Sequence, residues 1–77
     1  MNTTNTNANT HTDAELFRTW WAGLPMDRAK EVQKQIKEQL QWSSGTWYDR
    51  LHGRSNFSTP EKLLIMQIVQ DNPFIRL

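Results

Sequence analysis

The residues best suited to chemistry in this chain lie at positions 42 to 54, which read WSSGTWYDRLHGR. Their hydroxyl, carboxylate, imidazole and guanidinium groups can form hydrogen bonds with a partner. A helix over residues 44 to 52 would place Trp47 and Leu51 together on its buried side. Its other side would then carry small or polar residues that are free to meet a partner: Ser44, Gly45, Tyr48, Asp49 and His52.

Catalysis is not indicated by any pattern of residues. The chain has no Cys, and its two His residues, His11 and His52, are too far apart in sequence to suggest a zinc site. Glu31 and Glu38 share a helix face, but Lys34 lies between them and favours a solvent-exposed ion-pair face. No nucleophile–base arrangement or phosphate loop is visible. We therefore expect no enzymatic activity, metal, cofactor or small-molecule substrate.

The length and net charge of the chain limit the classes of protein to which it could belong. A chain of 77 residues predicts one small domain with a thin core, and the formal net charge is only +1. The basic excess is mild and lies in the middle of the chain, between residues 27 and 54. No apolar run approaches the roughly 20 residues of a membrane span, and the N-terminus does not resemble a secretory signal. We expect a cytoplasmic protein without a membrane partner.

The helical elements can be placed from their caps and apolar spacing. Residues 1–11 are rich in Asn and Thr and predict a disordered arm. Residues 12–77 predict an all-α, compact four-helix domain. Its first helix starts at a capping box of Thr12 and Glu15 and carries a broad apolar face that includes two Trp residues, which we interpret as core. The second helix covers residues 27–40.

The other two helices also have clear start signals. Ser43 is a good N-cap for the helix over 44–52, and Gly53 suits a left-handed C-cap. The last helix has two possible caps, Ser58 or Thr59, and the sequence does not choose between them. It is apolar over most of its circumference, and residues 63–77 could form the contact of a homodimer.

Residues 33–53, QKQIKEQLQWSSGTWYDRLHG, resemble the helix-turn-helix of phage-repressor-like (lambda-repressor-like) bacterial DNA-binding proteins. The resemblance rests on the apolar positions of the first helix, on the Ser after the turn, and on TWYDRLHG, which is similar to the TFYxxxxG end of some members. Two positions depart from the family pattern. Gln41 stands where the tight turn usually has Gly, so it must adopt an unfavourable conformation or change the turn. Lys37 replaces a small residue where the two helices touch. Its side chain can turn outward, but the contact must then open or the helix must rotate.

The resemblance implies a transcriptional regulator that binds double-stranded DNA as a dimer and inserts the helix over 44–52 into the major groove. The residues implied to face the groove are Ser43, Ser44, Gly45, Tyr48, Asp49 and His52. Those implied to contact phosphates are Lys34, Lys37, Arg50 and Arg54.

A second hypothesis remains open at this point. The near-neutral charge, Asp49 on the reading face and the apolar last helix would also suit a protein-interaction module. Such a module would keep the helix-turn-helix shape without binding DNA.

Overall fold

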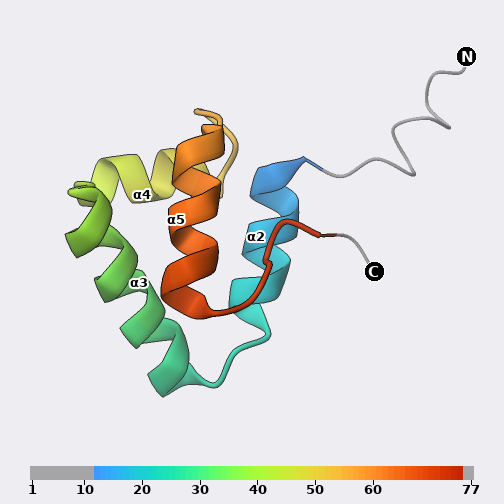
Figure 1. The fold of residues 1–77 in the computed structure, drawn as a ribbon, viewed down its shortest axis with the longest axis vertical. Helices are drawn as coiled ribbons and strands as arrows, with labels where there is room; N and C mark the ends of the chain where they lie inside the picture. Colours follow the sequence, from blue (N-terminus) through green and yellow to red (C-terminus); the bar gives the residue numbers. More distant parts are fainter. Residues whose placement is uncertain (1–11, 76–77) are drawn as a thin grey trace, which may run out of the picture.

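A computed structural model describes residues 12–75, and within that range the chain forms four α-helices and no strand (Figure 1). The all-α, four-helix fold predicted from the sequence is confirmed. The predicted arm, residues 1–11, lies outside the described residues, as do residues 76–77. The helices, with the labels of Figure 1, are α2 (Asp13–Ala22), α3 (Met26–Leu40), α4 (Ser44–Leu51) and α5 (Thr59–Val69).

Capping boxes begin the first and last of these helices. At α2, the Thr12 hydroxyl accepts from the backbone N–H of Glu15 at 3.1 Å, and the Glu15 carboxylate accepts from that of Thr12 at 3.1 Å. At α5, Ser58 and Glu61 make the same two bonds, at 3.2 and 2.9 Å. Ser58 is therefore the N-cap of α5, which decides between the two caps that the sequence allowed.

The four helices enclose a core that is rich in aromatic rings. In Figure 1, α5 lies between α3 and α2, and α4 lies across one end. The Trp47 ring meets Phe17 edge-on at 5.8 Å and Trp21 at 5.5 Å between ring centres. Because each aromatic side chain buries about 150–250 Å², a few of them supply much of a small core. The largest fully buried side chains on the helices are Trp47, Phe17, Ile36, Ile65 and Val32.

The C-terminal segment folds back over the domain toward α2 (Figure 1). Pro73 is fully buried, and the Phe74 ring stacks on Phe17 at 5.7 Å. The indole N–H of Trp20 donates to the Asp71 carboxylate at 2.9 Å. Residues 71–75 therefore dock on their own domain.

The turn between α3 and α4 consists of residues 41–43. Gln41 has φ 57° and ψ 42°, so it takes the left-handed conformation that Gly adopts most readily. The backbone N–H of Trp42 donates to the Lys37 carbonyl at 2.9 Å, which closes α3 in a Schellman motif. Gly53 closes α4 in the same way, with φ 79°, as its sequence position predicted.

Replacing Gln41 by Gly should stabilise the domain. A side chain in the left-handed region costs about 1–2 kcal/mol, which Gly avoids at the expense of a more flexible unfolded chain. We expect a gain of about 1 kcal/mol in the free energy of unfolding, measured by urea denaturation. Gln39→Gly, inside α3, is the matched control and should instead lose about 1 kcal/mol. A loss for both variants would show that the Gln41 conformation carries no strain.

Candidate nucleic-acid interface

Helix α4 is held to the domain by one side. Trp47 is 1% exposed and Leu51 is 6% exposed, so both lie in the core as the spacing predicted. Trp42, at the turn before the helix, is half-buried and packs against the same core. The Ser43 hydroxyl accepts from the backbone N–H of Thr46 at 3.1 Å and so caps the helix. These contacts hold α4 against the domain and leave its other side exposed.

The exposed side of α4 carries most of the predicted reading residues. Tyr48 is 52% exposed, and its ring stacks on the His52 ring with 6.2 Å between centres. Asp49 lies at the margin of this face, where its carboxylate is 3.9 Å from the guanidinium of Arg54. The structure places these residues together on one exposed face: Ser43, Ser44, Gly45, Tyr48 and His52.

A row of lysines from α3 adjoins the N-terminus of α4. Lys37 is half-buried, and its ammonium donates to the Ser44 hydroxyl at 2.9 Å. The side chain of Lys37 therefore reaches the first residue of α4. Lys30 and Lys34 continue the row along α3, and with Gln33, Lys37 and Glu38 they line a shallow depression. The sequence analysis did not include Lys30 among the candidate phosphate contacts. Its spacing of four residues from Lys34 and seven from Lys37 could have indicated that it shares their helix face.

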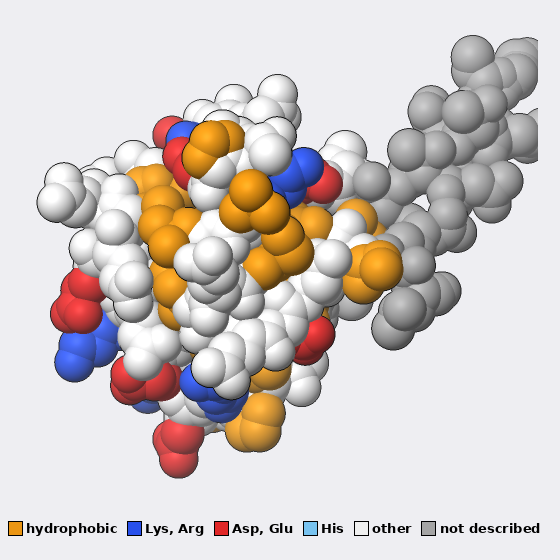
Figure 2. Space-filling model, viewed as in Figure 1, with side chains coloured by type: hydrophobic (Ala, Val, Ile, Leu, Met, Phe, Trp, Pro, Cys, Tyr) orange, Lys and Arg blue, Asp and Glu red, His pale blue; other side chains and the backbone are white. Residues whose placement is uncertain are grey.

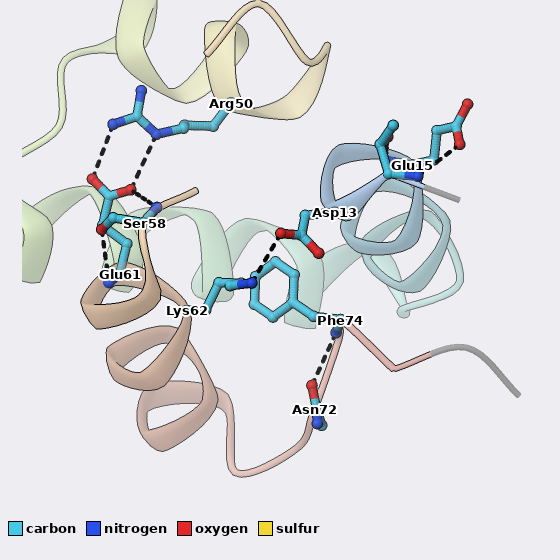
Figure 3. A network of polar contacts seen from close by, with 9 residues as sticks. Asp13, Glu15, Arg50, Ser58, Glu61, Lys62, Asn72 and Phe74 are labelled. Atoms are coloured by element: carbon cyan, nitrogen blue, oxygen red, sulfur yellow. Dashed lines mark hydrogen bonds and ion pairs between the residues drawn. The ribbon is translucent and has the colours of Figure 1, made fainter. Parts of the chain in front are cut away.

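Arg50 lies elsewhere, turned toward α5. Its Nε and Nη2 donate to the two carboxylate oxygens of Glu61 at 3.3 and 2.9 Å, and both side chains are 19% exposed (Figure 3). Its guanidinium carbon also lies 5.2 Å from the centre of the Trp42 ring. Because these contacts occupy the guanidinium, Arg50 is not part of the candidate interface. Arg54 differs, since its side chain is 74% exposed.

The pKa of the Glu61 carboxyl is lowered in this setting. Burial by itself raises the pKa, but the hydrogen bonds from Arg50 and from the backbone of Ser58 lower it by more. A lowered folded-state pKa means that the carboxylate stabilises the fold above its ordinary pKa. That contribution is lost as the pH falls through the lowered value.

The C-terminal end of α4 has a second anchor that sequence reasoning missed. The guanidinium of Arg18, in α2, donates to the backbone carbonyl of Leu51 at 2.8 Å. A cation at this position satisfies a free carbonyl and complements the helix dipole. Nothing local in the sequence signals the contact, because the two residues come together only through the packing of α2 on α4.

Comparison with models of known families, with curated proteins and with solved structures finds no match for this chain. Between residues 12 and 75, no helix is both long and apolar enough to cross a membrane. The same part of the chain contains no group of three or more His, Asp or Glu side chains that could hold a metal ion. The structure thus defines a small all-helical domain in which a three-residue turn joins α3 to α4.

Proposed function

We propose that this chain is a small DNA-binding domain, and that it acts in transcriptional regulation by inserting α4 into the major groove of double-stranded DNA. One observation carries the proposal. The polar face of a short, firmly anchored helix lies directly beside a row of lysines from the preceding helix, joined to it by the Lys37–Ser44 hydrogen bond.

The size and chemistry of α4 fit a major groove. Its eight residues span about 12 Å, and the groove is about 12 Å wide and admits an α-helix. Gly45 allows close approach, and the Ser44 hydroxyl can donate to or accept from a base edge. Tyr48 and His52 add polar aromatic groups further along the helix, and Asp49 could accept from a cytosine amine.

Phosphate contacts would flank the helix. Backbone N–H groups at the start of α4 favour an anion, and Lys37 stands at that end. Lys34 and Lys30 would extend the contact along the DNA backbone, and Arg54 would contribute beyond the C-terminal end of α4. Such contacts supply salt-sensitive affinity and set the orientation, while the α4 face would supply whatever sequence preference exists.

The test is fluorescence anisotropy of a labelled duplex of mixed sequence, titrated with the protein at about 50 mM and about 200 mM salt. With Lys30, Lys34, Lys37 and Arg54 at phosphates, each bound protomer should contribute about −3.6 to the slope of log K against log salt. Folded protein that leaves the anisotropy unchanged at the lower salt would refute DNA binding.

We further propose that a second copy of the chain covers an apolar groove over α5 and the C-terminal segment. Figure 2 shows hydrophobic side chains gathered over α5. Leu63 is 53% exposed and Ile75 is 56% exposed at this groove. A dimer would present two α4 helices to two half-sites, which a single short helix cannot do. Sedimentation equilibrium should show a dimer that Leu63→Glu dissociates, and a monomer at every concentration would refute it.

The rival function is a protein-interaction module on the same scaffold. The engagement of Arg50 with Glu61 and the position of Asp49 beside the exposed face favour it, because both reduce the positive charge available to DNA. The anisotropy titration separates the two hypotheses, since the rival predicts no duplex binding by folded protein.

A further inference from the structure

Helix α4 is too short to hold its own orientation. It has eight residues, and isolated helices below about 12–15 residues are marginal in water. Its position therefore depends on contacts with other elements. The contact at Arg50 differs from the core packing because it is directional: it joins two side-chain nitrogens to two carboxylate oxygens.

The carboxylate that receives Arg50 is itself fixed. Oε1 of Glu61 also accepts from the backbone N–H of Ser58 at 2.9 Å, and the backbone N–H of Glu61 donates to the Ser58 hydroxyl (Figure 3). The capping box thus locks Glu61 to the first turn of α5. On the other side, the Arg50 guanidinium lies against the Trp42 ring of the turn. A continuous chain of contacts runs from the start of α5, through α4, to the turn that precedes α4.

We propose that Glu61 is a positioning residue, which sets the rotation of α4 about its axis through Arg50. This inference rests on the proposed function, because rotation matters only if the exposed face of α4 reads a partner. Arg50 lies two residues after Tyr48, and residues two apart point to different sides of a helix. Holding Arg50 toward α5 therefore keeps Tyr48 and His52 directed outward.

The neighbouring residue offers a matched control. Lys62, the residue after Glu61 in α5, also forms an ion pair, but its partner is Asp13 of α2, at 3.0 Å (Figure 3). Neutralising Lys62 removes a more exposed ion pair from the same turn of α5 without touching α4. In Glu61→Gln, the new side chain can still complete the capping box, so α5 keeps its N-terminus while the charged link to Arg50 is lost.

The experiment compares Glu61→Gln with Lys62→Gln by amide hydrogen exchange and by duplex binding. In Glu61→Gln, exchange of the α4 amides should accelerate at least tenfold relative to the core amides of α3 and α5. Duplex affinity should fall about tenfold with an unchanged salt slope, because no phosphate contact is removed. Lys62→Gln should change neither measurement.

Three results would overturn the proposal. The first is α4 exchange that is unchanged, or that accelerates equally with α3 and α5. The second is an unaltered duplex affinity in Glu61→Gln. The third is a higher affinity with a slope steeper by about 1, which would mean that freed Arg50 contacts a phosphate. If the wild-type protein binds no duplex, the proposed function fails and hydrogen exchange alone decides whether Glu61 holds α4.

Discussion

Trp47→Ala should remove about 3–5 kcal/mol from the free energy of unfolding, the cost typical of truncating a fully buried large aromatic side chain. Trp47 is 1% exposed and meets the rings of Phe17 and Trp21, so its loss opens a cavity between α2 and α4. Domains have a free energy of unfolding of roughly 0.05–0.15 kcal/mol per residue, so the loss is a large part of the total free energy of unfolding of this small domain. Urea denaturation followed by circular dichroism at 222 nm measures it.

Tyr48 supplies the matched control, because it is the next residue on the same helix and is half-exposed. Tyr48→Ala should change stability by no more than about 0.5 kcal/mol. Should the alanine variant of Trp47 fail to fold, Trp47→Phe gives a measurable intermediate loss of roughly 1–3 kcal/mol. Equal effects at Trp47 and Tyr48 would contradict the assignment of the two sides of α4.

The second large effect concerns the lysine row. Replacing Lys30, Lys34 and Lys37 together by Gln should make the slope of log K against log salt shallower by about 3 units, since each phosphate contact contributes about 0.9. At about 0.1 M salt the duplex affinity should fall on the order of 100-fold. The physical reason is the loss of counterion release at the α3 surface, and anisotropy over a salt series measures it.

Single substitutions provide the control for this prediction. Lys34→Gln and Lys62→Gln remove the same charge, one from the α3 row and one from the α2–α5 ion pair. Only Lys34→Gln should change the slope, by about 1. If both changes alter it equally, the protein responds to net charge alone and the lysine row is not an interface.

Much of the fold was predictable because its signals are local. Three helix ends could be located to within a few residues from the sequence, through the N-caps Thr12 and Ser43 and the C-terminal Gly53. For Gln41 the sequence left two outcomes, an unfavourable conformation or a changed turn, and the structure shows the first. Ser58 and Thr59 could not be separated from sequence, because both satisfy local capping rules. The choice became visible only in the reciprocal bonds between Ser58 and Glu61.

The candidate site was less predictable, because side-chain engagement is set by tertiary packing. Arg50 and Arg54 look alike in the sequence, yet only the first finds a carboxylate on another helix, eleven residues away. The link from Arg18 to Leu51 spans 33 residues and follows no periodicity. The exposed face of α4, in contrast, was predictable, since the burial of Trp47 and Leu51 fixes which side remains outside.

The most direct test of DNA reading by α4 is an amide NMR titration of the folded protein with a mixed-sequence duplex at low and at higher salt. The proposal predicts shifts that cluster at residues 43–54 and at Lys30, Lys34 and Lys37, and that fade as salt rises. A folded protein whose spectrum does not change, or changes only over residues 63–75, would contradict DNA reading and leave the apolar surface of α5 as the place where a partner binds.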